Sequence, residues 1–132
     1  MIRSDFKIPL YGVDVTLVQV EGVGDAEAVE SILRNVKADK EYAVDTVNGV
    51  KRGCCNGAET YRNLDLKKVV VIFYKITSER ERDNVYSHEK RHIEDRVMEW
   101  YGVNDIESAG LLAGFLGEKF GEFRKKVKEK SY

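Results

Sequence analysis

Residues 68–101 read KVVVIFYKITSERERDNVYSHEKRHIEDRVMEWY, and this stretch decides most of the fold. Its first nine residues, 68–76, form an almost continuous apolar run, which is typical of a strand that is buried on both faces. We expect this run to be the centre of a sheet. The pattern changes at Ser78, where Ser78 and Glu81 have the spacing of a helical capping box. Apolar residues then recur at helical spacing until Gly102, which predicts one long helix.

The predicted helix carries the motif H-E-x-x-H at His88, Glu89 and His92, and the chain has no other histidine. Positions i and i+4 lie on one face of a helix, so both imidazoles can bind one metal ion. Zinc held by two imidazoles and a third ligand keeps one coordination position for water, whose pKa it lowers towards neutrality. Glu89 lies where it could accept the proton. The motif therefore predicts a zinc hydrolase site, and the alternative is a pair of surface histidines on a charged helix.

Composition limits the classes of protein that remain. A chain of 132 residues is long enough for one core, so we expect a single domain over 1–132. The formal net charge of −1 argues against nucleic-acid binding by bulk electrostatics. No apolar run is long enough to span a membrane, and the first residues lack the apolar segment of a signal peptide. The cytoplasm is therefore the expected compartment.

The two cysteines, Cys54 and Cys55, are adjacent in the sequence. Neighbouring cysteines rarely bridge each other because the resulting ring is strained, so the pair does not indicate a disulfide framework. Each is interpreted as a small buried apolar residue. A role for one of them as a metal ligand remains the alternative.

The other elements follow from periodicity and turn signals. Alternation over 6–20 predicts one or two strands interrupted near Pro9 and Gly12, and 25–38 has the spacing of an amphipathic helix capped by Asp25. Between these and the central strand, two Asn-Gly dipeptides predict hairpins, and the expected short strands are 42–47, 50–55 and 58–62. A closing helix is expected from Asn104 through Phe123. Its Lys-rich end, 124–132, is expected to be a frayed, solvated helix end, with a partner or nucleic-acid contact as the alternative.

The predicted fold class is therefore α+β: a small, twisted, mostly antiparallel sheet backed by an N-terminal helix, the motif helix and a C-terminal helix. This layout, with H-E-x-x-H at 88–92, resembles the zincin metallopeptidases and is similar to small single-domain zinc peptidases of phages and mobile elements. The resemblance implies zinc bound by His88 and His92, with Glu89 as general base and then general acid. It also implies an edge strand that binds an extended peptide by β-augmentation, for which 57–62 is the candidate.

The third zinc ligand needs a separate argument because no histidine remains. In the glutamate branch of the zincins an acidic residue on the next helix completes the site, and Glu107 has that position. Glu107 also fits a capping box with Asn104, so both interpretations stay open. The acidic alternatives are Asp105, Asp95 and Glu118. Cys54 or Cys55 would give a site that resembles peptide deformylase, although the glycine- and leucine-rich signatures of that family are absent.

Two hypotheses about function follow. The first is a zinc-dependent peptidase with a peptide or protein substrate, in which Tyr86 or Tyr101 could stabilise the developing oxyanion. A tyrosine at a helix end is also simply a packing residue with its hydroxyl at the surface, and Trp100 is expected in the core. The second hypothesis is a non-catalytic interaction or regulatory module of zincin fold. A chain of this size leaves little room for specificity pockets, so a lid, a partner or a homo-oligomer could complete the cleft.

Overall fold

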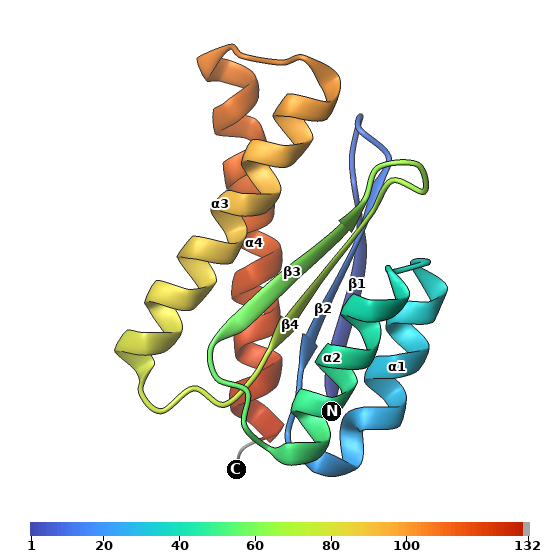
Figure 1. Cartoon of the computed structure of the whole chain (residues 1–132). Helices are drawn as coiled ribbons and strands as arrows, with labels where there is room; N and C mark the ends of the chain where they lie inside the picture. The colour runs from blue at the N-terminus through green and yellow to red at the C-terminus, as the bar shows by residue number, and fades with distance from the viewer. Residues whose placement is uncertain (131–132) are drawn as a thin grey trace.

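The computed structural model describes residues 1–130 and has four strands and four α-helices in the described part of the chain (Figure 1). A short 3-10 turn, η1, precedes the first α-helix. The elements in chain order are β1 (Ile2–Ile8), β2 (Val13–Gln19), η1 (Val23–Asp25), α1 (Ala26–Asn35), α2 (Lys40–Arg52), β3 (Ala58–Asn63), β4 (Lys68–Phe73), α3 (Glu79–Tyr101) and α4 (Ile106–Lys130).

The strands form one mixed sheet in the order β1-β2-β4-β3. β1 pairs with β2 and β3 pairs with β4 in antiparallel fashion, whereas β2 and β4 are parallel. β2 and β4 therefore occupy the centre, as predicted for 68–76, and β1 and β3 are the edges. The predicted α+β class and the mostly antiparallel pairing are both confirmed, since two of the three strand pairs are antiparallel.

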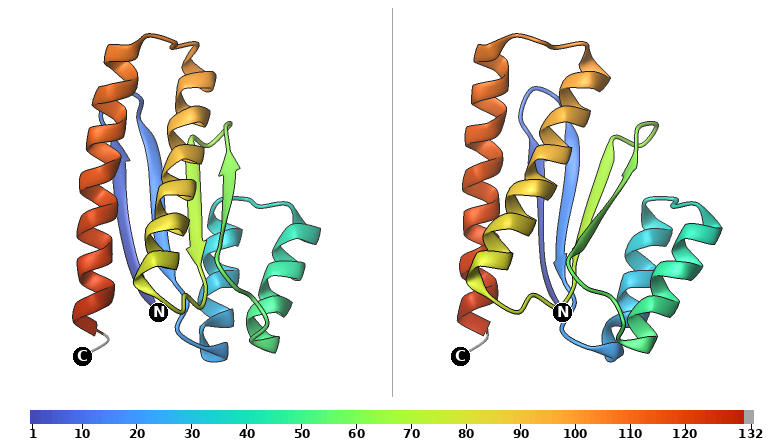
Figure 2. Two further views of the ribbon diagram at one scale, coloured as in Figure 1. Left: turned by 90° about the vertical axis from the view of Figure 1, so that its left-hand side faces the viewer. Right: turned by 60° about the vertical axis from the view of Figure 1, so that its left-hand side comes forward.

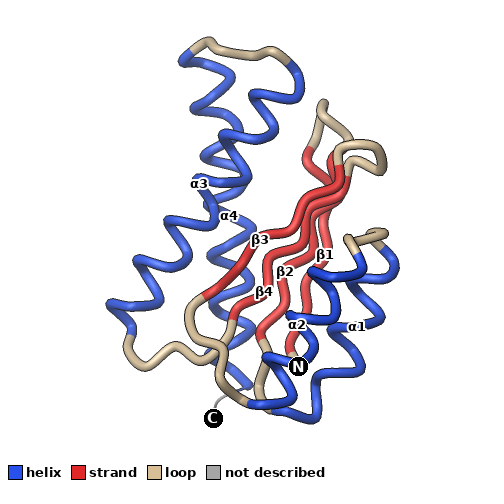
Figure 3. The backbone as a smooth tube through the Cα atoms, viewed as in Figure 1, coloured by secondary structure: helices blue, strands red, loops and turns tan. Residues whose placement is uncertain are grey.

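Two pairs of helices cover opposite faces of the sheet, as the tube drawing and the side views show (Figures 2 and 3). Successive residues of β4 alternate between the faces: Val71 and Phe73 pack with α3 and α4, and Val70 and Ile72 pack with α1 and α2. All four side chains are at most 1% exposed. The apolar run at 68–76 is continuous because both faces of this strand are buried.

The region 40–52 corrects the prediction, because it is the helix α2 rather than the strands 42–47 and 50–55. Thr46, Val47 and Val50 are buried at helical spacing against the sheet. Gly49 was interpreted as a turn residue, but it lies inside the helix, and a Cβ there would be 2.6 Å from the Cys55 Sγ. The glycine allows close packing, which its dipeptide context does not reveal. The third predicted strand, 58–62, is confirmed as β3.

The motif helix begins and ends as predicted. The Ser78 side chain accepts a hydrogen bond from the Glu81 backbone at the start of α3, and Gly102 ends the helix in the left-handed conformation with φ 63°. The Lys-rich end differs from the prediction: α4 continues through Lys130 with Val127 buried, and Arg124 bonds to Glu79 at 2.5 Å. The helix end is thus packed against the start of α3. Residues 131–132 of the predicted tail lie outside the described residues.

Among residues 1–130, none of the helices combines the length and the apolar character that crossing a membrane requires.

Candidate metal site on helix α3

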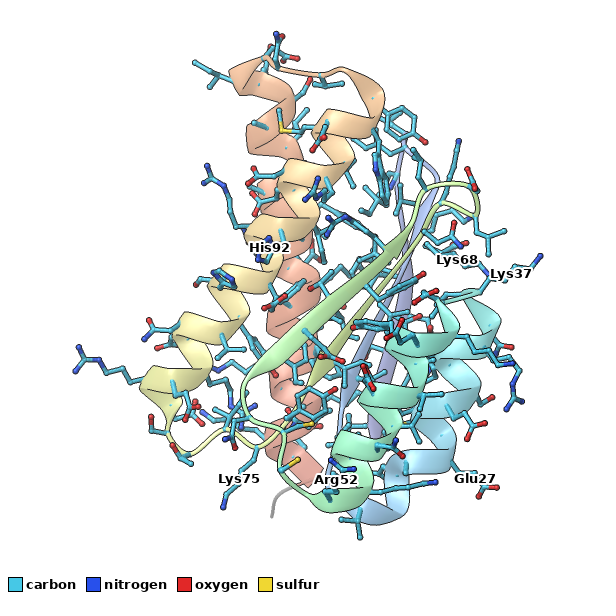
Figure 4. All side chains as sticks on the ribbon, viewed as in Figure 1. Glu27, Lys37, Arg52, Lys68, Lys75 and His92 are labelled. Carbon is cyan, nitrogen blue, oxygen red and sulfur yellow. The ribbon has the colours of Figure 1, made fainter. Side chains whose placement is uncertain are left out.

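The two histidines lie together on one face of α3, near the middle of the helix, and His92 is labelled in Figure 4. Their Nε2 atoms are 2.9 Å apart, and the rings meet edge to face with centroids 4.4 Å apart. Both residues are exposed. The i, i+4 spacing thus brings two imidazole nitrogens to one point at the surface, as the sequence predicts.

Glu89, unlike the two histidines, is buried and only 5% exposed. Its Oε2 accepts a hydrogen bond from the Thr60 hydroxyl of β3. This contact joins the motif helix to the edge strand of the sheet. Sequence reasoning missed Thr60 because nothing in the pattern of 57–62 indicates which of its side chains faces α3. That assignment needs the register of β3 against β4, in which Thr60 lies opposite Val71.

The three side chains have a donor set that fits zinc. One ligand atom from each of His88, Glu89 and His92 lies within 4.8 Å of the other two. Ligands at about 2.0–2.1 Å from a tetrahedral zinc are about 3.3 Å from one another, so the imidazole nitrogens need to separate by only about 0.4 Å. Imidazole nitrogen and carboxylate oxygen are both ordinary zinc ligands. Two imidazoles and a carboxylate fit zinc if all three bind it; if Glu89 is instead the base, His88 and His92 supply two of the usual three protein ligands, and no third lies with them among the described residues.

The charges that surround the histidines are largely paired along the helix. Lys90 bonds to Glu94 at 3.0 Å and Arg91 bonds to Asp95 at 3.2 Å, both at i, i+4 spacing. The Arg91–Asp95 pair is exposed and adds little to stability, whereas the side chains of the Lys90–Glu94 pair are only 25% and 13% exposed. Both pairs reduce the repulsion that a free lysine and a free arginine would exert on a bound cation.

The structure does not bring Glu107 to the two histidines. Of the His, Cys, Asp and Glu side chains in the described ranges, only His88, Glu89 and His92 form a group that could hold a metal. Gly117 of α4 lies beside Lys90, and Glu107 is ten residues earlier in the same helix. At 1.5 Å per residue, Glu107 is on the order of 12 Å along the helix from the level of His92.

The alternative third ligands also lie outside this group. Asp105 accepts a hydrogen bond from the Ser108 backbone at 2.8 Å, and this bond lowers the pKa of its carboxyl. Asp105, rather than the predicted Asn104, therefore makes the side-chain bond at the start of α4. Asp95 is taken by Arg91, and Glu118 is exposed. Cys54 and Cys55 are free thiols at the end of α2, on the other side of the sheet.

The aromatic residues near the motif have packing roles. Tyr86 is buried, with its ring centroid 4.6 Å from that of Phe73, and burial raises the pKa of its hydroxyl. Tyr101 donates a hydrogen bond to the Tyr11 carbonyl and so ties the end of α3 to the turn after β1. Trp100 is half-buried against the core, as predicted.

The opposite face of β3 carries a polar cluster that the sequence does not signal. Glu59 Oε1 accepts hydrogen bonds from the Thr46 hydroxyl at 2.9 Å and from the Tyr74 hydroxyl at 2.8 Å. Tyr74 is 4% exposed, and burial together with the neighbouring Glu59 carboxylate raises the pKa of its hydroxyl. Because Thr46 belongs to α2 and Tyr74 directly follows β4, the cluster holds α2 and the end of β4 to the edge strand.

Comparison of this chain with known protein families, curated proteins and solved structures gave no match.

Proposed function

We propose that this chain is a zinc-dependent peptidase that uses the H-E-x-x-H group of α3. The observation that carries the proposal is the convergence of His88, Glu89 and His92, whose ligand atoms lie within 4.8 Å of one another. A helix that places two imidazoles and a carboxylate in this order supplies two metal ligands and a base. β3 lies beside this helix at the edge of the sheet.

The chain's own residues have distinct roles in this proposal. His88 and His92 would hold the metal. Glu89 takes a proton from water and returns it to the leaving amine. Thr60 positions this carboxylate by bonding to Oε2, which leaves Oε1 without a hydrogen-bond partner among the described residues. A bound zinc ion supplies Lewis-acid chemistry, which polarises a carbonyl group and makes water acidic enough to react near neutral pH.

The substrate would be an extended peptide that pairs with the free edge of β3. On one side β3 pairs with β4, and on the other side its backbone groups have no strand partner in the described chain. An added strand satisfies such groups with main-chain hydrogen bonds. Since Thr60 of this strand touches Glu89, a peptide beside β3 would lie next to the base.

A second candidate is a non-catalytic interaction module, and the burial of Glu89 is the observation that favours it. A carboxylate that is 5% exposed and bonded to Thr60 also serves to join α3 to the sheet, whether or not it accepts a proton from water. In that case the contact between Glu89 and Thr60 would be purely structural, and the histidines would bind metal without turnover or would not bind it.

Metal analysis of the purified protein separates the two candidates. We expect about one zinc per chain in the wild type, loss of zinc in His92→Ala, and retention in Arg91→Ala, whose altered side chain is adjacent and exposed. Peptide hydrolysis should then be lost in Glu89→Gln while zinc is retained. Zinc without hydrolysis in the wild type supports the module. If the protein binds no zinc at saturating micromolar metal, and if His88→Ala is as stable as the wild type, a metal site is contradicted altogether.

A further inference from the structure

The sheet contains a topological switch point that is separate from the metal site. β2 and β4 are neighbouring parallel strands, so their carboxyl ends lie side by side. The chain leaves β2 towards α1 on one face of the sheet and leaves β4 towards α3 on the other face (Figure 1). Where adjacent parallel strands continue to opposite faces, a crevice opens outside their carboxyl ends, and this is where open α/β sheets bind ligands.

A hollow of about 500 Å³ occupies this position. Gln19 and Val20 line it from the end of β2, and Tyr74 and Lys75 line it from the end of β4. Its size is within the range of small-molecule sites. The apolar part of the wall comes from Ile76, next to Lys75, and from residues on four further elements: Ile2, Val23, Val50 and Val127.

Arg82 lines the hollow from the first turns of α3 and is poorly paired. Its side chain is 15% exposed, yet its nearest carboxylate, Glu79, is 3.7 Å away, because Glu79 bonds to Arg124 at 2.5 Å. Among residues 1–130, the only hydrogen bond from the guanidinium goes to the Tyr86 hydroxyl at 3.4 Å, and the Tyr86 ring offers a cation–π contact at 5.7 Å. A largely buried guanidinium with five donors normally has closer acceptors.

Two further charges define the electrostatics of the hollow. Lys75 is exposed and has no ion pair within residues 1–130, and Figure 4 shows it at the end of the molecule away from His92. Glu21 is the one acidic residue in the wall, and its carboxylate is 2.5 Å from the Met1 amino group. The backbone donors of Glu21 and Gly22 are used by Asp25, at 2.7 and 3.3 Å. An anion in the hollow would therefore be bound by side chains rather than by the loop.

We propose that this hollow binds a small molecule with an anionic head group, held by Arg82 and Lys75, and an apolar body that rests on the aliphatic wall. The head group is an oxyanion, either a phosphate or a carboxylate, since a guanidinium binds both in bidentate fashion. The site does not need the metal: Arg82 precedes His88 by six residues, which is about 9 Å along the helix.

Three naphthalene probes with one apolar body test the proposal: 1-naphthyl phosphate, 1-naphthoate and neutral 1-naphthol. We expect saturable binding of at least one anionic probe by isothermal titration. The shifted amide signals in NMR spectra should belong to Gly22, Gly53 and Ile76, which line the hollow. Tighter binding of the phosphate assigns a phosphorylated ligand, and tighter binding of the naphthoate assigns a carboxylate. Equal affinity for 1-naphthol, or no saturable binding at millimolar concentration, overturns the proposal.

Matched variants place the site. Arg82→Gln should weaken binding of the anionic probe about tenfold or more, whereas Arg80→Gln, an exposed change in the same turn, should leave the affinity unchanged. Lys75→Gln should weaken binding about threefold. Because Lys75 is exposed, this variant should fold, so it tests the site even if Arg82→Gln fails to fold. His92→Ala should bind the probe like the wild type. Equal losses in the Arg80 and Arg82 variants, or loss in His92→Ala, contradict this location.

Discussion

Replacing Thr60 with valine should loosen the contact between the motif helix and the sheet. Valine keeps the shape and β-branching of threonine, so the strand propensity of β3 changes little. What is lost is the hydroxyl that bonds to Glu89 Oε2. Glu89 is 5% exposed, so its carboxylate cannot readily replace this donor with water. A hydrogen bond to a charged group contributes about 1.5–3 kcal/mol, and we expect a loss of about 2 kcal/mol in unfolding free energy.

Urea denaturation measures this loss directly. With a slope of about 2 kcal/mol per M, a loss of about 2 kcal/mol lowers the unfolding midpoint by about 1 M. Thr16→Val is the matched control. The Thr16 hydroxyl on β2 also bonds to a carboxylate, that of Asp5 at 2.7 Å, but the Asp5 side chain is exposed to water. There we expect a change of at most about 0.5 kcal/mol.

The Glu89→Leu background decides whether the hydroxyl acts through the carboxylate. With leucine at position 89 no charge needs the donor, so adding Thr60→Val should be nearly neutral or stabilising. The difference between the two backgrounds is the coupling energy of the pair. The same loss of about 2 kcal/mol in both backgrounds would refute the reasoning, because Thr60 would then stabilise the fold through a different partner.

Two further predictions concern packing and pH. Gly49→Ala should lower the unfolding free energy by about 1 kcal/mol, since overpacking against the Cys55 Sγ costs more than the gain of up to about 1 kcal/mol in helix propensity. In a Cys55→Ala background, denaturation should show the same change to be stabilising; destabilisation in both backgrounds would contradict a clash with the sulfur. The hydrogen bond from Arg124 lowers the pKa of Glu79 below its ordinary value of 4.5. The ionised pair therefore stabilises the fold above pH 4.5, and this stabilisation is lost as the pH falls below 4.5. The difference in urea midpoint between wild type and Glu79→Gln should therefore shrink below pH 4.5, and a difference that is constant with pH would argue against the pair.

Sequence patterns predicted the elements that are set by burial of the whole strand or by residues at the helix ends. β4 is an apolar run because both of its faces are covered, and α3 has a capping serine and a terminal glycine that act within a few residues of the sequence. The helix 40–52 was missed because its Asn48-Gly49 dipeptide resembles a hairpin turn. The small residue at Gly49 is explained by its contact with Cys55, which lies outside the helix. Local sequence signals fail where the choice of a residue depends on its contact with a side chain from outside its own helix or strand.

The sequence by itself determined the α+β class and the adjacency of His88, Glu89 and His92, because a helix fixes which residues share a face. Only the tertiary structure decided that Glu89 bonds to Thr60, that Glu107 lies far along α4 from the histidines, and that Arg82 faces a hollow at the ends of β2 and β4. These three facts depend on strand order, register and helix docking. Strand order, register and helix docking depend on the burial of whole faces of helices and sheets, so no short stretch of sequence encodes them.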